Sequence, residues 1–170
     1  INALDPDSDD DGLYDGTALG LDCAATGTDP LKGHCIADAD KGATKTDPLL
    51  WDTDGGGASD GSEDANLNGA KDSGEGDPTL GNGADDASVV DTDKDGLSDA
   101  LEKFLGSGVN DADSDDDGLL DGDEHNPADD TDGDGLRNVV DVDSDDDGLY
   151  DGTDDGAGRD EPATDQTAKH

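Results

Sequence analysis

The sequence predicts a mostly irregular fold: an extended array of short acidic loops, with one or a few short helices and little or no sheet. One observation is a twelve-residue pattern, most complete at residues 113–124, with acids at positions 1, 3, 5, 9 and 12 and glycine at position 6. The other is the shortage of core-forming residues, because hydrophobic residues make up only 28% of the chain and aromatic residues 2%. So little apolar surface cannot offset the conformational entropy of folding. Another source of stability is required.

The acidic pattern has the order of oxygen ligands that surrounds a Ca²⁺ ion. Alternate residues of a tightly turning backbone point to one side, so the carboxylates at positions 1, 3 and 5 converge. Glycine at position 6 permits the sharp turn. The carbonyl oxygen of position 7 and the carboxylate of position 12 complete the shell, whereas zinc or copper would select histidine or cysteine. We therefore expect several bound Ca²⁺ ions to stabilise the fold.

The formal net charge of −40, from 49 acidic and 9 basic residues, would by itself predict a self-repelling, disordered chain. The regular placement of the acids indicates dense metal loading instead, since about twenty divalent ions would neutralise the chain. So acidic a surface disfavours nucleic acid and anionic membranes as partners. No apolar run approaches the roughly 18 residues of a membrane span.

The start of the chain is repeated near its end. Residues 7–17 recur unchanged at residues 143–153, an offset of 136, and 17 of the 34 positions that overlap at this offset are identical. We expect a window from a longer array, with further copies of the repeat as partners in the same chain or in a polymer. Residues 1–18 then begin in mid-loop, and residues 155–170 form a tail or the start of the next repeat.

Residues 19–50 depart from the loop pattern. Cys23 and Cys35 are the only cysteines, and their proximity predicts a local disulfide and an oxidising, extracellular or cell-surface location. A zinc site that adds His34 is the alternative, although it lacks a fourth ligand. The proline after Asp29 and after Asp47 favours extended backbone, which suits a single ligand reaching a neighbouring cage and equally suits an ordinary turn.

Residues 52–88 hold two loops in direct succession and a glycine-rich segment. The first loop, residues 52–63, has Gly56 at position 5. The second, residues 64–75, has asparagine in place of two carboxylates. We expect residues 76–88 to form a plain loop, with Asp77 as a single ligand before proline.

Residues 89–154 contain four loops, which start at residues 91, 113, 130 and 143, and the only convincing helix. Leu97, Leu101 and Leu105 recur every four residues, and we place Phe104 on the same face. Gly106 is suited to end the helix.

The predicted metal ligands are the side chains at positions 1, 3, 5, 9 and 12 of the loops, the carbonyl oxygens of the leucines at position 7, and single acids near the loops. They are Asp5, Asp7, Asp9, Asp11, Leu13, Asp15, Asp29, Asp38, Asp40, Asp47, Asp52, Asp54, Asp60, Glu63, Asp64, Asn66, Asn68, Asp72, Glu75, Asp77, Asp91, Asp93, Asp95, Leu97, Asp99, Glu102, Asp111, Asp113, Asp115, Asp117, Leu119, Asp121, Glu124, Asp130, Asp132, Asp134, Leu136, Asn138, Asp141, Asp143, Asp145, Asp147, Leu149, Asp151 and Asp154. The first loop has Ala18 at position 12, so we expect Asp5 or a later acid to complete its cage.

Paired EF-hands do not fit the spacing of the loops, since several starts lie only 12 to 17 residues apart and leave no room for two flanking helices. The Asp-x-Asp-x-Asp-Gly-Leu-x-Asp strings at Asp7, Asp91, Asp113 and Asp143 resemble thrombospondin type 3 repeats in their long bacterial surface-protein version. This resemblance covers most of the chain outside residues 19–50. It implies chain wrapped around many closely spaced Ca²⁺ ions and a role as a spacer or stalk outside the cell.

The leading functional prediction is a calcium-rigidified extracellular stalk or filament. The alternative is a cell-surface adhesin, a binding module that presents or contacts a surface, glycan or mineral. A calcium sensor would need an apolar, often methionine-rich groove, and the chain has no methionine. No nucleophile or histidine stands in a recognisable catalytic pattern, so we predict no catalytic residue and no enzymatic activity.

Overall fold

The computed structural model describes residues 5–24, 28 and 32–154. The predicted ligand Asp29 and the segment 155–170 lie outside these residues, as does the side chain of Asp154. Within the described residues there is no β-strand, and the ordered elements are short. The α-helices are α1 (Asp15–Ala18), α2 (Asp60–Glu63), α3 (Asp99–Leu105) and α4 (Asp151–Asp154), and the 3₁₀ turns are Asp86–Ser88, Asp121–Asp123 and Asn138–Val140. The prediction of a mostly irregular fold is confirmed.

The short helical turns have a common origin in the loop pattern. All but the turn at 86–88 begin at position 9 of an acidic loop. The residue at position 8 is extended before α2, α3 and the turns at 121–123 and 138–140. Where position 8 is serine, its hydroxyl caps the helix: Ser59 accepts the N–H of Ser62, and Ser98 accepts the N–H of Leu101. An acid at the first helical position also interacts favourably with the helix N-terminus. Six of the seven loops therefore encode their own exit turn, and the loop at residues 64–75 is the exception.

The predicted helix is confirmed as α3, with one correction. Leu101 and Leu105 are buried, and Gly106 ends the helix in a left-handed conformation with φ of 102°. Phe104, which the sequence analysis placed on the same face, is 41% exposed. Residues 101 and 105 are nearly aligned at 3.6 residues per turn, whereas residue 104 is rotated to the edge of that stripe. Its ring lies 5.1 Å from the guanidinium of Arg137.

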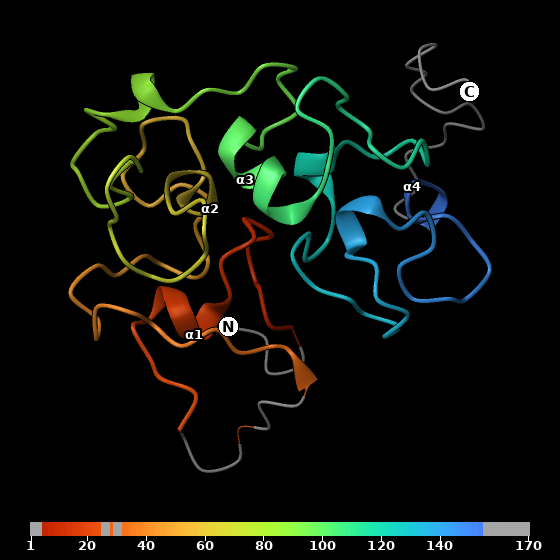
Figure 1. Cartoon of the computed structure of the whole chain (residues 1–170), viewed down its shortest axis with the longest axis horizontal. Helices are drawn as coiled ribbons and strands as arrows, with labels where there is room; N and C mark the ends of the chain where they lie inside the picture. The colour runs from red at the N-terminus through yellow and green to blue at the C-terminus, as the bar shows by residue number, and fades with distance from the viewer. Residues whose placement is uncertain (1–4, 25–27, 29–31, 155–170) are drawn as a thin grey trace.

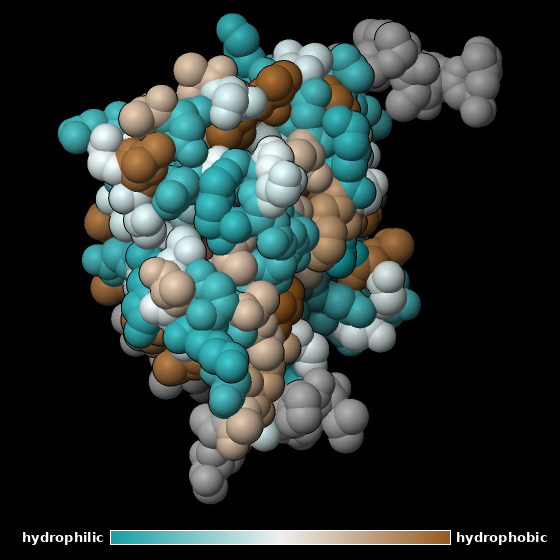
Figure 2. Space-filling model, turned by 60° about the vertical axis from the view of Figure 1, so that its left-hand side comes forward, coloured by the Kyte–Doolittle hydropathy of each residue, from teal (hydrophilic) through white to brown (hydrophobic). Residues whose placement is uncertain are grey.

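A small hydrophobic cluster joins loops that are far apart in sequence. It consists of Leu13, Ala18, Leu67, Leu97, Leu101, Leu105 and Val139. Helix α3 supplies two of these residues and lies near the middle of the molecule, with α1 and α2 on one side and α4 on the other (Figure 1). On the face shown in Figure 2 hydrophilic residues predominate, and apolar residues form small separate areas, which is ordinary at a protein surface.

The described chain folds back on itself, which corrects the expectation of an extended array within this window. The N–H of Gly61 donates to Asp11 Oδ2 at 3.2 Å, and the N–H of Asn126 donates to Asp10 Oδ1 at 3.0 Å. The hydroxyl of Tyr14 lies 3.4 Å from Asp129 Oδ1. No single loop can bury its own leucines, so several loops must meet around one cluster. None of the helices in the described residues is long and apolar enough to cross a membrane.

Candidate metal centres

The loops share a set of bonds that shapes them. The side chain at position 1 accepts the N–H of position 6, as Asp7 Oδ2 does from Gly12 at 2.8 Å. The side chain at position 5 accepts the N–H of position 7, as Asp11 Oδ1 does from Leu13 at 2.7 Å. Gly12 has φ of 91°, a conformation that glycine adopts without steric cost. The bond to position 1 recurs with Asp52, Asp64, Asp91, Asp130 and Asp143.

In the loops that start at residues 7, 91 and 113, the carboxylates at positions 1, 3 and 5 converge, with one oxygen of each within 4.8 Å of the others. Burial raises the pKa of Asp7 to about 8 and the pKa of Asp95 to about 7, and the neighbouring carboxylates add to both shifts. Like charges held so close and away from water repel each other unless a cation lies between them. These groups could hold a metal ion, and their all-oxygen character suits a hard divalent cation. They are Asp7, Asp9 and Asp11; Asp91, Asp93 and Asp95; and Asp113, Asp115 and Asp117.

Position 9, predicted as a ligand, also ties the two ends of the loop together. Asp121 accepts both the N–H and the hydroxyl of Ser114 at position 2, at 2.7 and 2.6 Å. A helical turn starts at position 9, so these bonds fix the direction in which the chain leaves the loop. In the sequence, a serine or threonine at position 2 indicates this pair of hydrogen bonds. The same pair of bonds joins Ser8 to Asp15 and Thr53 to Asp60.

A fourth cluster is shared between two loops. Asp95 and Glu102 belong to the loop that starts at residue 91, and Asp121 belongs to the loop that starts at residue 113. All three are buried, and one oxygen of each lies within 4.8 Å of the others. Glu102 has no exposed surface, and neither of its carboxylate oxygens has a hydrogen-bond partner. Burial, followed by the charges of Asp93 and Asp95, raises the pKa of Glu102 to about 8.

The loops that start at residues 113 and 143 also approach each other, since the N–H of Gly152 donates to Asp117 Oδ2. Glu124, at position 12 of the loop at 113, is 2% exposed. Burial raises its pKa to about 10, and the charges of Asp115, Asp117 and Asp151 contribute. Asp117 and Asp151 hold the same loop positions as Asp95 and Asp121. The spacing of the sequence predicts that the acids of a loop serve that loop, and only the three-dimensional contact between loops brings acids of two loops together.

The first loop lacks an acid at position 12, where Ala18 stands. Its Asp11 is 1% exposed, and burial together with the charges of Asp7, Asp9 and Asp60 holds the pKa of Asp11 well above its usual range. Asp60 is position 9 of the loop that starts at residue 52, so the same kind of inter-loop approach occurs here. Asp5, the predicted substitute ligand, has a buried Oδ1 without a hydrogen-bond partner.

The loop at residues 64–75 is closed by its own amides. The side-chain amide of Asn66 donates to Glu75 Oε1 at 2.7 Å and to Asp72 Oδ2 at 3.2 Å. The amide of Asn68 donates to the same Asp72 oxygen at 2.9 Å. Neutral amide donors here offset part of the repulsion between the carboxylates, which the all-acid loops leave uncompensated.

Several predicted single ligands take part in local turns. Asp47 Oδ1 accepts the N–H of Leu49 at 3.3 Å, and Asp77 Oδ1 accepts the N–H and hydroxyl of Thr79 at 3.1 and 2.8 Å. The carboxylate of Asp40 accepts two backbone N–H groups and the hydroxyl of Thr44. These bonds are typical of turn formation by aspartate. Asp38 differs, because its Oδ2 is buried without a hydrogen-bond partner.

The loops that start at residues 130 and 143 are the most open. Asp132, Asp134, Asp145 and Asp147 are exposed. Asp141, at position 12, still faces its own loop, since burial and the charges of Asp134 and Asp132 raise its pKa. The exposed acids stay hydrated, so their ionised forms cost less free energy than those of the buried acids, and less repulsion has to be offset here.

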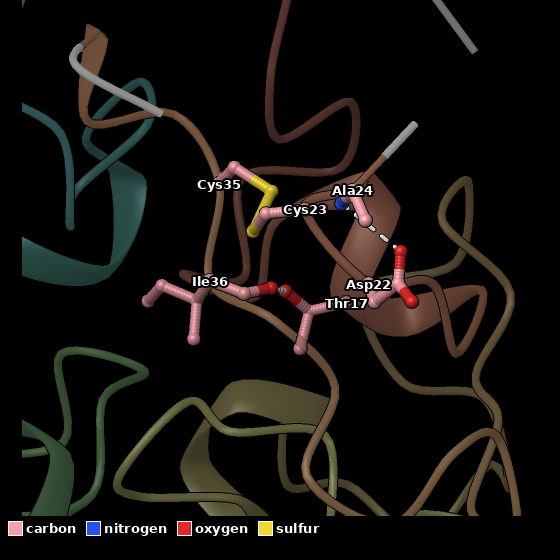
Figure 3. Close-up of a disulfide and its surroundings, with 6 residues drawn as sticks. All are labelled: Thr17, Asp22, Cys23, Ala24, Cys35 and Ile36. Carbon is pink, nitrogen blue, oxygen red and sulfur yellow. Dashed lines mark hydrogen bonds between the residues drawn. A yellow bond between two sulfur atoms is a disulfide. The ribbon is translucent and has the colours of Figure 1, made fainter. Parts of the chain in front are cut away.

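The predicted disulfide is confirmed. Cys23 and Cys35 are joined, with an S–S distance of 2.14 Å and a Cα–Cα distance of 6.0 Å (Figure 3). The alternative zinc site is wrong, because both sulfurs are used in the bond and the His34 ring lies 3.0 Å from Asp129 Oδ2. Next to the disulfide, the hydroxyl of Thr17 donates to the carbonyl of Ile36 at 2.6 Å, which ties this segment to α1 (Figure 3).

The fold and the sites together define an acidic loop protein, with a small apolar cluster, one disulfide and several carboxylate groups that could hold metal ions. The chain matches no protein-family model, and no curated protein matches its sequence. Its function is therefore argued from the sites alone.

Proposed function

We propose that the chain is a calcium-binding structural module of an extracellular stalk or filament, made rigid by many bound Ca²⁺ ions. The observation that carries the proposal is the buried group of Asp95, Glu102 and Asp121, in which Glu102 has two carboxylate oxygens without hydrogen-bond partners. Three acids away from water are costly without a counter-ion. An oxygen-only site fits Ca²⁺, and an ion bound there would hold two loops together.

The contact between loops supports assembly into an array. Residues 137–154 correspond to residues 1–18 by the 136-residue offset, so the loop at 143 opens the following repeat. The N–H of its Gly152 donates to Asp117 Oδ2 at 2.6 Å. The bond between Gly61 and Asp11 joins the same two loop positions within one repeat. Consecutive repeats would thus be joined by the same bond that joins two loops within a repeat. An array would then be a series of compact units.

The disulfide supports an extracellular location, because such bonds persist in oxidising surroundings. A cell-surface adhesin is the second candidate. The folding of the described chain back on itself favours it, because a compact module can present a surface, as an extended strut does not.

The test of calcium-dependent folding is to compare the whole chain in saturating Ca²⁺ and in excess chelator, by small-angle scattering and by limited proteolysis. We expect expansion and rapid cleavage in chelator, because little apolar burial opposes the repulsion between acids. A compact, protease-resistant chain in chelator would contradict the proposal. Binding of purified chain to glycan or mineral surfaces, with no elongated particles from a multi-repeat protein, would favour the adhesin instead.

A further inference from the structure

The loop at residues 52–63 lacks a carboxylate at position 5, where Gly56 stands. In the other loops the position 5 side chain accepts the N–H of position 7, as Asp95 does from Leu97 and Asp117 from Leu119, both at 2.8 Å. By sequence alone this loop is therefore an incomplete cage.

An aspartate from another part of the chain, Asp86, occupies the place of the missing side chain. Ala58, at position 7, donates its N–H to Asp86 Oδ2 at 3.0 Å. A Cβ built on Gly56 would overlap the same carboxylate. Asp86 thus lies where a position 5 side chain would lie and accepts the bond that such a side chain would accept.

The glycine-rich segment docks closely on this loop. The N–H of Asn82 donates to the carbonyl of Asp54 at 3.1 Å. Gly83 has φ of 58° and lies so near Gly56 that a Cβ on either residue would overlap the Cα of the other. Because Gly56 has no side chain, residues 82–86 can pack against the loop. This segment in turn supplies the carboxylate of Asp86 to the loop. The prediction of a plain loop at residues 76–88 misses this role, because the sequence shows no contact between residues 52–63 and 82–86.

Three acids meet at this place, and the buried Glu63 of the same loop is close enough for their charges to act on it. One carboxylate oxygen each of Asp54, Asp85 and Asp86 lies within 4.8 Å of the others. Glu63, at position 12, is an independent observation: it is 1% exposed, and neither of its carboxylate oxygens has a hydrogen-bond partner. Burial, then the charges of Asp86, Asp54 and Asp85, raises its pKa to about 8. None of the ion pairs in the described part of the chain involves any of the four.

We propose that Asp54, Glu63, Asp85 and Asp86 form a composite site for a hard divalent cation, Ca²⁺, in which Asp86 replaces the missing position 5 ligand. The donors are carboxylates only, which excludes a preference for zinc or copper. An ion here ties residues 82–88 to the loop at 52–63. The inference rests on the proposed function, since both require that the chain binds Ca²⁺.

The test counts bound Ca²⁺ per chain by equilibrium dialysis and follows affinity by titration calorimetry, using the whole chain. Asp86→Asn should lose one ion per chain, or bind it about tenfold or more weakly, because one charged ligand is removed. Asp123→Asn is the control. It makes the same change of charge in another loop, at a side chain that is exposed. Calcium-dependent protection of residues 76–88 from proteolysis should fall in Asp86→Asn and persist in the control.

A second variant separates ligand loss from misfolding. Asp85→Asn removes a different carboxylate of the same group and leaves the bond from Ala58 to Asp86 in place. It should lose the same ion. Should Asp86→Asn fail to fold in Ca²⁺, the ion count of Asp85→Asn decides.

Equal ion counts and affinities in the natural chain, Asp86→Asn and the control would overturn this site and leave the proposed function intact. The same holds if Asp85→Asn folds and keeps the full number of ions. A natural chain that binds no Ca²⁺ at all would overturn both.

Discussion

Gly122 packs directly against the backbone of Asp95, so closely that a Cβ on the glycine would overlap the Asp95 carbonyl oxygen. Gly122 is position 10 of one loop, and Asp95 is position 5 of the loop before it. This approach brings Asp121 to Asp95 and Glu102 and so creates the shared acidic group. Gly61 against Asp11 and Gly152 against Asp117 repeat the relationship.

Gly122→Ala should destabilise the calcium-loaded chain by about 1–3 kcal/mol, because the added methyl forces two backbones apart. Gly16→Ala is the matched control: it holds the same position in the first loop, lies in α1, and has open space around its Cα. We expect the control to be neutral or slightly stabilising, since alanine favours helix. Denaturant unfolding in saturating Ca²⁺ measures both. Equal effects of the two substitutions would show that the inter-loop contact does not matter.

Glu102→Gln should act in opposite directions with and without calcium. In chelator it removes a buried charge that repels Asp93 and Asp95, so the melting temperature should rise. In saturating Ca²⁺ it removes a ligand, so the melting temperature should fall relative to the natural chain. Asp123→Asn, an exposed change in the following loop, should move neither value much. A shift of the same sign in both conditions would contradict a metal site at Glu102.

The calcium-free chain should lose stability as the pH rises. Burial raises the folded-state pKa of Asp7, Glu63 and Glu102 to about 8, above their ordinary values near 4. The folded state then binds more protons than the unfolded state, so the stability is fully present below about pH 4 and is lost as the pH rises toward 8. Calorimetry in chelator across this range measures the trend.

Saturating Ca²⁺ should reverse that trend, because ions and protons compete for the same carboxylates. Calcium affinity should therefore increase from pH 5 to pH 8. A metal-free chain that becomes more stable between these pH values would contradict the burial of uncompensated acids.

Removal of the disulfide should cost about 3 kcal/mol of unfolding free energy by the chain-entropy estimate. The bond joins residues 12 apart, in the segment that has the fewest complete acidic loops. Cys23→Ser with Cys35→Ser, unfolded by denaturant in Ca²⁺, measures the loss. In the natural chain, both thiols should react with an alkylating reagent only after reduction. Alkylation without reduction would show that the bond does not form.

A protein of several 136-residue repeats should be a chain of compact units whose length grows in proportion to the number of repeats. The motivating contact is the bond from Gly152 to Asp117 across the repeat boundary. Scattering or electron microscopy in millimolar Ca²⁺ should show elongated particles that lose stiffness in chelator. Repeats that collapse into one globule at saturating Ca²⁺ would rule out the stalk and favour the adhesin.

The sequence by itself determined the local features. Alternating acids, glycine at position 6 and leucine at position 7 define the loops, since each bond within a loop spans only a few residues. The helix from Asp99 to Leu105 and the disulfide followed from leucine spacing and from the cysteine count. These features depend on neighbours along the chain, and short-range spacing is what a sequence displays directly.

Only the tertiary structure decided which loops share their acids. Nothing in the spacing indicates that Asp121 faces Glu102, or that Asp86 takes the place of a side chain at Gly56, 30 residues earlier. Both depend on glycines that allow two backbones to approach, and on a small apolar cluster that needs several loops to bury it. Contacts between distant segments arise from packing in three dimensions. For this reason acids that the spacing places in separate loops lie together in one group, as Asp121 does with Asp95 and Glu102.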